Sequence, residues 1–162
     1  AGLERPPWLQ GESLLPLVDG RVERLHEYLF FEQTYHAAYE PMRGVRDERH
    51  IYIRRFDQRE KLVLPNTDDT PAKSDLIEHG WQQQPRHQEM LYDHYFDPEQ
   101  QNNLIDRPEL APTLAVLCRR LDDWMAATAD PLLVGPVPIP QGAQVTDVDV
   151  SSPGQAPLIT GE

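Results

Sequence analysis

The residues between 39 and 55 restrict the fold of this chain more than any other part of the sequence. Side chains at 42–46 alternate between two faces, and the next run alternates again, with β-branched and aromatic residues prominent, as expected of half-buried strands. The acidic pair at 47–48 turns the chain between the two runs, and Pro41 suits the entry to a strand. The stretch therefore predicts a β-hairpin with strands at 42–46 and 49–55.

Two further strands are predicted from the same kind of pattern. Residues 26–33 have a continuously apolar centre, Tyr-Leu-Phe-Phe at 28–31, which is typical of a strand covered on both faces and indicates a central place in the sheet. Residues 34–40 are expected to follow as a loop. Residues 89–93 form the last predicted strand, so the sheet should contain about four strands.

One long amphipathic helix is predicted at 108–128. Its apolar residues recur at spacings of four and three, and they form one stripe that can cover one face of a sheet. The stripe contains Leu110, Leu114, Leu117, Leu121 and Trp124, flanked by Cys118 and Met125. Pro108 suits a first helical turn but Pro112 would remove a backbone hydrogen bond, so the first turn should be a separate, kinked piece. The fold class is therefore α+β, a small antiparallel sheet with this helix packed on one face.

The remaining segments are irregular. Residues 57–88 contain at best a short strand at 61–64 and a short helix with Ser74 as its N-cap, ended by Gly80. An irregular span of this length is usually functional or held by another surface. Residues 131–162 contain six prolines and are predicted to form an extended strap or a disordered end.

The first 25 residues are expected to be a connector, because prolines and glycines interrupt them too often for a long helix. Some of their side chains are nevertheless too apolar for a free linker and need a surface to pack on. These are Trp8, Leu14, Leu15 and Leu17. Together with the second face of the 26–33 strand, they predict a docking surface for another part of a longer protein.

Composition argues against several classes of protein. The 162 residues carry a formal charge of −12, which is unsuited to nucleic acid or an anionic membrane, since both attract basic surfaces. The single cysteine cannot form an internal disulfide. No run approaches the roughly 20 apolar residues that span a bilayer. Sixteen prolines and 39% hydrophobic residues indicate a loop-rich chain with a small core.

The chain carries four segments, in order, that resemble the sulfatases of the alkaline-phosphatase superfamily. They are Gly-Glu-Ser-Leu-Leu-Pro-Leu at 11–17, Tyr-Glu-Pro-Met-Arg-Gly-Val-Arg at 39–46, the run from Leu-Tyr-Asp to Asn-Leu at 91–104, and the run from Trp to Asp-Pro-Leu at 124–132. Within the family, the heparan N-sulfatase (sulfamidase) type is the most similar. The resemblance extends over residues 3–135.

This resemblance implies that the chain is the small C-terminal subdomain of a sulfatase. Residues 1–25 would then be the connector from a missing large domain, residues 26–130 the subdomain itself, and residues 131–162 a Pro-rich tail. The N-terminal catalytic domain of the same sulfatase would be its main partner. The parent would be periplasmic or secreted, with any export signal upstream of Ala1.

The resemblance also implies that the nucleophile and metal lie outside this chain. Sulfatases use a formylglycine made from the Cys or Ser of a C/S-x-P-x-R motif, together with a divalent metal held by aspartates, and neither pattern occurs here. Calcium and the formylglycine are therefore expected in the missing N-terminal part. We expect no catalytic residue and no metal ligand in this chain, and the fragment alone should be inactive.

Residues in this chain that could suggest other chemistry have simpler interpretations. Cys118 lies on the apolar stripe of the helix, where a buried small side chain is expected. The six histidines lack the spacing of a zinc site. The pairs Asp68-Asp69 and Asp147-x-Asp149 lack a glycine-pivoted calcium loop and are expected to be solvated turns.

The best candidates for substrate binding are His36, Tyr39 and Arg43. In the family the C-terminal subdomain lends side chains to the rim of the active-site pocket. The resemblance therefore implies that Arg43 meets a sulfate or carboxylate with two hydrogen bonds, and that His36 or Tyr39 lines a sugar of a sulfated glycan. The alternative is that the arginines pair across strands with acidic neighbours, which are Glu32, Glu40, Asp47 and Glu48.

Two classes of function stay open at this point. In the first, the chain is the C-terminal part of a sulfatase that hydrolyses sulfate esters or N-sulfate groups on a glycan, with the nucleophile and metal supplied by a missing N-terminal part. In the second, it is a stand-alone, non-enzymatic acidic α+β module that binds a partner through Trp8, Trp81 and the Pro-rich tail.

Overall fold

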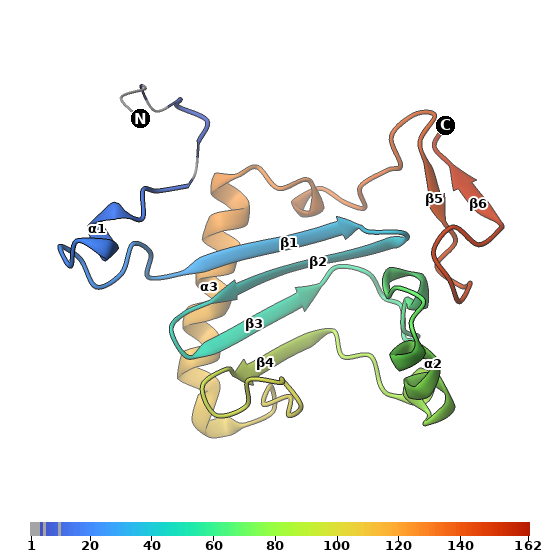
Figure 1. Cartoon of the computed structure of the whole chain (residues 1–162), viewed down its shortest axis with the longest axis horizontal. Coiled ribbons are helices and arrows are strands. Elements are labelled where there is room, and N and C mark those ends of the chain that lie inside the picture. The colour runs from blue at the N-terminus through green and yellow to red at the C-terminus, as the bar shows by residue number, and fades with distance from the viewer. Residues whose placement is uncertain (1–3, 5, 10) are drawn as a thin grey trace.

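The computed structural model describes residue 4, residues 6–9 and residues 11–162, and it forms one sheet backed by one long helix (Figure 1). The sheet has four antiparallel strands in the order β1-β2-β3-β4. They are β1 (Leu29–Tyr35), β2 (Tyr39–Arg46), β3 (His50–Arg55) and β4 (Glu89–Asp93). The predicted hairpin is confirmed as β2 and β3, and its strands lie at the centre of the sheet.

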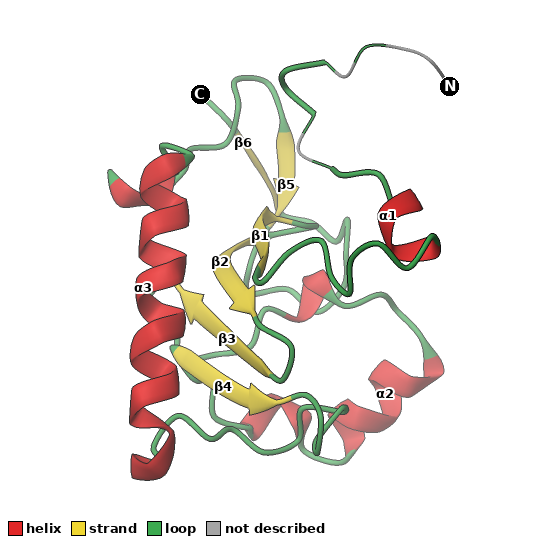
Figure 2. Ribbon diagram, turned by 90° about the vertical axis from the view of Figure 1, so that its left-hand side faces the viewer, coloured by secondary structure: helices red, strands yellow, loops and turns green. Residues whose placement is uncertain are grey.

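The helix α3 (Ala111–Ala127) lies across one face of this sheet (Figure 2). The core between them is continuous, because Val45 lies opposite Tyr52 and Tyr52 opposite Leu91, so that all three side chains face the helix. The helix contributes Leu117, Leu121 and Met125 to this core, each fully buried. The predicted α+β fold, with one long helix on one face of a small antiparallel sheet, is confirmed.

The apolar stripe of α3 differs slightly from the predicted one. Its most buried positions are Leu117, Leu121 and Met125, whereas Leu114 and Trp124 are only half-buried. Residues four apart stay on one face of a helix with 3.6 residues per turn, so Met125 belongs to the buried row with Leu117 and Leu121 and does not flank it. The separate first turn is confirmed, since a 3₁₀ turn at Pro108–Leu110 precedes the helix.

The prediction of a central, doubly covered first strand is wrong, because β1 lies at the edge of the sheet and begins at Leu29. Its apolar run is explained by a different contact on each face. Phe30 stacks on Trp124 of α3, with ring centroids 5.1 Å apart. Phe31 lies over Gly44 on the other face, where an added Cβ would come within 2.1 Å of the ring.

The face opposite α3 carries no second long helix in the described ranges, and its burial is uneven. Ile51 and Met90 on this face are 6% and 8% exposed, whereas Leu29 and Phe31 at its β1 edge are 51% and 38% exposed. In Figure 1 the strands are seen in front of α3, and nothing crosses before them. The short helix α1 (Leu15–Val18) lies beyond the start of β1 and buries none of its residues. Trp8 is 77% exposed, Leu14 65% and Leu15 63%. These are the side chains predicted to form a docking surface, and the docking itself stays a prediction.

The irregular segment after β3 contains short helices and no strand. A 3₁₀ turn at Leu64–Asn66 takes the place of the strand predicted at 61–64, because Pro65 lacks the N–H that strand pairing needs. The helix α2 (Pro71–Glu78) is capped by Thr70, whose hydroxyl accepts from Lys73 N, and not by Ser74. A 3₁₀ turn at Trp81–Gln83 follows.

The C-terminal tail is ordered and returns to the sheet. After a 3₁₀ turn at Pro131–Leu133, it forms a hairpin of β5 (Gln144–Thr146) and β6 (Leu158–Thr160). This hairpin lies beside the right-hand end of the main sheet in Figure 1. Of the two predicted forms, an extended strap and a disordered end, the tail is closer to the strap. The pairing of β5 with β6 was not predicted. None of the helices in the described ranges is long and apolar enough to cross a membrane.

Candidate functional site

The turn between β1 and β2 is held by hydrogen bonds from two distant parts of the chain. The two strands are joined by residues 36–38, called here the hairpin tip. The loop predicted at 34–40 is therefore longer than the observed turn, because β1 ends at Tyr35 and β2 begins at Tyr39. Tyr35 lies opposite Tyr39, after a register irregularity that begins at Gln33. His36 is exposed at this tip, and Ala38 is fully buried beneath it. The tip therefore presents one imidazole on a buried base.

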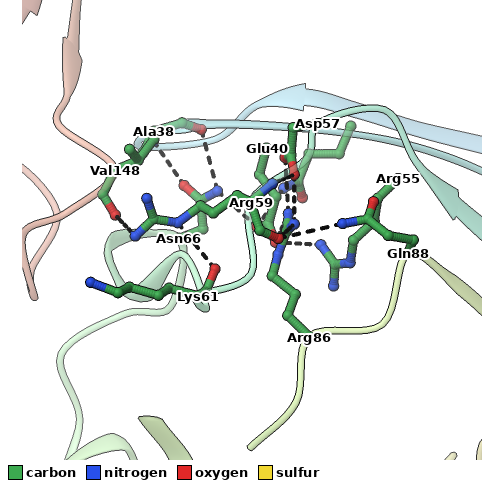
Figure 3. Close-up of polar contacts among 11 residues, drawn as sticks. Ala38, Glu40, Arg55, Asp57, Arg59, Lys61, Asn66, Arg86, Gln88 and Val148 are labelled. Atoms are coloured by element: carbon green, nitrogen blue, oxygen red, sulfur yellow. Dashed lines mark hydrogen bonds and ion pairs between the residues drawn. The ribbon is translucent and has the colours of Figure 1, made fainter. Parts of the chain in front are cut away.

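Asn66 holds the tip from the side of the irregular segment (Figure 3). Its amide oxygen accepts from Ala38 N at 2.8 Å, and its amide nitrogen donates to Ala38 O at 3.2 Å. One side chain thus satisfies both polar groups of a buried backbone unit, as a neighbouring strand would do. The same amide nitrogen donates to Glu40 at 3.0 Å, which ties the tip to the start of β2.

The C-terminal tail holds the tip from the opposite side. Thr146 N donates to Ala37 O at 2.8 Å. The Tyr35 hydroxyl donates to Val137 O at 2.7 Å, and the Tyr39 hydroxyl accepts from Val137 N at 3.2 Å, so the two hydroxyls bind both backbone polar groups of one residue. Burial, and then the neighbouring Tyr39, raise the pKa of Tyr35, which keeps its hydroxyl a donor. His36 therefore sits on a turn fixed by segments about thirty and one hundred residues away in sequence.

A buried ionic network supports the base of the site. Glu40 pairs with Arg55 at 2.5 Å and lies 3.5 Å from Arg86. Arg86 makes two parallel bonds to Asp57, at 2.6 and 2.9 Å, and its side chain is fully buried. Figure 3 shows these side chains converging between the sheet and the irregular segment. The network pins both ends of the 57–88 segment, which explains how so irregular a span stays ordered.

Arg43, the predicted anion-binding residue, lies inside the fold. Its side chain and that of Asp130 are each 2% exposed, and they pair through two bonds of 2.5 and 3.1 Å. The remaining guanidinium donors reach backbone oxygens of Gln33 and Met42 and the hydroxyl of Thr34. A substrate could reach Arg43 only after this pair broke, so Arg43 serves the structure of the described chain.

The carboxylate of this pair is held in its charged form. Burial opposes the ionisation of Asp130, but hydrogen bonds from Arg43 and from Leu132 N, with the charge of Arg43, outweigh it and lower the pKa of the carboxyl. The alternative of internal arginine pairing is therefore the one seen at Arg43, with Asp130 as the principal partner. Glu32, one of the predicted partners, lies 3.5 Å from the same guanidinium.

The structure separates the three predicted site residues. His36 and Tyr39 lie together at the hairpin tip, whereas Arg43 lies under α3 and its continuation. Sequence reasoning missed Asn66, Asp57 and Arg86, whose only signal was that they lie in or beside an irregular span. No group of three or more His, Cys, Asp or Glu side chains within the described ranges could hold a metal ion. Cys118 is half-buried beside the core, close to its predicted environment.

Comparisons with known proteins show which proteins this chain is similar to. No protein-family model matches the chain. Over 162 residues it is 30% identical to an ulvan-active sulfatase of Formosa agariphila, and the match covers 94% of this chain and 32% of that protein. Over 146 residues it is 30% identical to the human N-sulphoglucosamine sulphohydrolase, covering 79% of this chain and 28% of that protein. The chain resembles part of a sulfatase.

A solved sulfatase structure agrees with these sequence relatives. The sulfatase-like chain superposes on a 2-O GAG sulfatase with a TM-score of 0.55 and 24% identity, over 82% of this chain and 23% of that one. At this identity the likeness shows the fold alone, and it agrees with the predicted α+β fold. The chain spans about a third or less of each of these relatives. The resemblance read from the four sequence segments is therefore confirmed.

Proposed function

We propose that this chain is the C-terminal portion of a sulfatase that hydrolyses sulfate esters or N-sulfate groups on a glycan. One observation carries the proposal: similarity to an ulvan-active sulfatase extends along 94% of the chain but covers only 32% of that relative. The chemistry would then come from the remainder of the protein. That remainder would supply the formylglycine nucleophile and the calcium ion, since the described residues offer no comparable cluster.

The exposed apolar side chains of β1 and of the segment before it are the proposed contact with that remainder. Leu29 and Phe31 on β1 are 51% and 38% exposed, and Leu14 and Leu15 in the preceding segment are 65% and 63% exposed. Monomeric domains seldom leave large apolar patches in water, which favours a docking role for these side chains. Burying each large apolar side chain would contribute roughly 1.5 to 3 kcal/mol to docking before ordering costs.

The hairpin tip is the proposed contribution of this chain to the substrate pocket. His36 is exposed, its imidazole can donate and accept hydrogen bonds, and its backbone is fixed by Asn66 and Thr146. Such a group can form hydrogen bonds to sugar hydroxyls or a sulfate oxygen, and the entropic cost of binding is small because the backbone that carries it is already ordered. The Tyr39 ring would form the adjoining wall, because its hydroxyl is already engaged by Val137.

The decisive experiment compares the complete protein with the chain alone. We expect the complete protein to release sulfate from sulfated sugars and from a chromogenic aryl sulfate in the presence of calcium. The isolated 162-residue chain should release none above the buffer blank. Turnover by the repurified chain would contradict the proposed division of labour. Absence of sulfate release by the complete protein from a panel of N- and O-sulfated glycans would favour the non-enzymatic interaction module instead.

Replacing His36 tests the role of the tip. In the complete protein, His36→Ala should lower kcat/KM for a sulfated disaccharide by about 10- to 100-fold, the loss expected for one hydrogen bond to a charged group. Turnover of an aryl sulfate, which has no sugar to contact, should change little. His79→Ala is the matched control, since His79 is 73% exposed at the end of α2. Equal losses with both substrates would show that His36 does not act through the sugar.

A further inference from the structure

A concave site lies between the irregular segment and the C-terminal tail, apart from the hairpin tip. It has a volume of about 490 Å³, and its walls come from the segment after β3, from Gln82 and Gln83, and from tail residues 148–151. This volume is within the range of ligand pockets in proteins, roughly 300 to 1,000 Å³, and is sufficient for a sugar unit. The predicted substrate residues do not line it.

The walls of this pocket are fastened to one another by specific bonds. Arg59 donates to Lys61 O at 3.0 Å, to Val148 O at 3.1 Å and to the Asp149 carboxylate at 2.7 Å. On the other side, the buried Lys73 ammonium donates to Ser151 O at 2.7 Å. The tail is therefore held on both sides of the pocket, so the cavity does not depend on a loose loop.

The charge inside the pocket is opposite in sign to that of the chain. Arg59 and Lys61 outnumber the single lining carboxylate, Asp149, although the chain as a whole carries −12. The hydrogen bond from Arg59, then its charge and, more weakly, the charge of Lys61 lower the pKa of Asp149. The Lys61 side chain is exposed, and among the described residues none forms a hydrogen bond or ion pair with its ammonium group. The two basic side chains exceed the one carboxylate by one charge, and this excess positive charge is available to a ligand.

The remaining lining groups suit a carbohydrate. Gln82 and Gln83 are exposed and carry amides that can both donate and accept, as sugar hydroxyls require. Leu62 and Leu64 are half-buried and supply an apolar patch for the C–H face of a ring. One free cation, two amides and a small apolar surface together match an anionic sugar better than an uncharged or purely apolar ligand.

We propose that this pocket binds an anionic sugar residue, one carrying a sulfate or carboxylate, at a position on the glycan away from the hydrolysed group. The assignment rests on the proposed function, because it treats the ligand as part of a longer sulfated substrate. Lys61 receives the anionic group, Gln82 and Gln83 receive hydroxyls, and Arg59 positions the tail. The pocket would then favour longer glycans over single sugars.

The test uses the complete protein and the substitution Lys61→Gln, with sulfated tetrasaccharides from heparin and from ulvan as probes. Binding of the preferred tetrasaccharide should weaken about tenfold, the effect of roughly 1.4 kcal/mol for one charge-assisted contact. Turnover of a sulfated monosaccharide should be unchanged. Arg119→Gln is the matched control, since it removes one exposed positive charge from the outer side of α3.

The outcomes separate the pocket from the proposed function. If the two variants, Lys61→Gln and Arg119→Gln, bind the tetrasaccharide with equal affinity, either neither has lost affinity or both have. Either result overturns the proposed pocket and does not contradict the proposed sulfatase function. Lys61-dependent tetrasaccharide binding by a complete protein that hydrolyses no sulfate supports the pocket and overturns the proposed function. Loss of binding in Lys61→Gln alone, with unchanged monosaccharide turnover, supports both.

Discussion

Replacing Asp130 with asparagine is expected to lower the free energy of unfolding of the sheet and helix by about 3 to 5 kcal/mol, the usual loss when one partner of a buried ion pair is removed. The variant leaves the Arg43 guanidinium charged and 2% exposed, and the carboxylate that stays near it is that of the 61%-exposed Glu32, 3.5 Å away. Native-state hydrogen exchange at the Val45 amide in the complete protein measures this opening directly. A loss below about 1 kcal/mol would contradict the structural role of the pair.

Asp123→Asn is the matched control, because Asp123 is exposed on α3 and the same chemical change there should cost little. The pair also makes a prediction about pH. The folded pKa of Asp130 is lowered, so its stabilisation is fully present above the unfolded value of about 3.9 and is lost as the pH falls through the folded pKa. The free energy of unfolding of the unsubstituted protein should fall at acid pH by more than that of Asp130→Asn. The difference between the two is the contribution of the Asp130 carboxylate.

Replacing Leu121 with alanine should destabilise the same unit by about 2 to 5 kcal/mol. Leu121 is fully buried at the centre of the α3 contact, between Leu117 and Met125, so truncation removes packed methyl groups and leaves a cavity. The same hydrogen-exchange measurement, extended to amides of α3, should show the helix and β2 losing protection together. Protection lost only in α3 would mean that the helix is not part of one cooperative core.

Val116→Ala is the control for this truncation, since Val116 lies on the same helix but is 40% exposed. Its cost should stay within about 1 kcal/mol, as expected for a partly solvated side chain. Alanine has a higher helix propensity than leucine or valine, so propensity cannot cause a loss in either variant. A similar loss in both variants would therefore contradict the conclusion that burial at Leu121 sets the cost of its truncation.

Local periodicity accounts for the parts of the fold that could be predicted from sequence. The β2–β3 hairpin and α3 could be predicted because the side chains that face the core recur every two residues in the strands and every three or four in the helix. The same reasoning misplaced β1, since an apolar run at Phe30 and Phe31 is equally explained by Trp124 on one face and by Gly44 on the other. Periodicity records which residues are apolar, and it does not record which neighbour covers them.

The polar part of the site could not be predicted for a related reason. Asn66 reaches Ala38 across 28 positions, and Arg86 reaches Asp57 across 29, so no short window contains both partners. The family resemblance implied a ligand for Arg43, and the alternative named only acidic residues close to it in sequence. The carboxylate with which Arg43 pairs is 87 positions away. The position of His36 on a turn could be predicted because such a turn is located from the strands on either side, whereas its role in binding stays a prediction.

The distance between Arg43 and Asp130 also has a consequence for biosynthesis. At roughly 5 to 20 residues per second, a ribosome needs about 4 to 17 seconds to synthesise the 87 positions between them. Throughout that interval the guanidinium must stay hydrated, and the side of β2 that carries it cannot be sealed. The first three strands can pair as they emerge, but the core closes only after the last turn of α3 has left the exit tunnel. Translation order therefore makes the closing of this small subdomain a single late event.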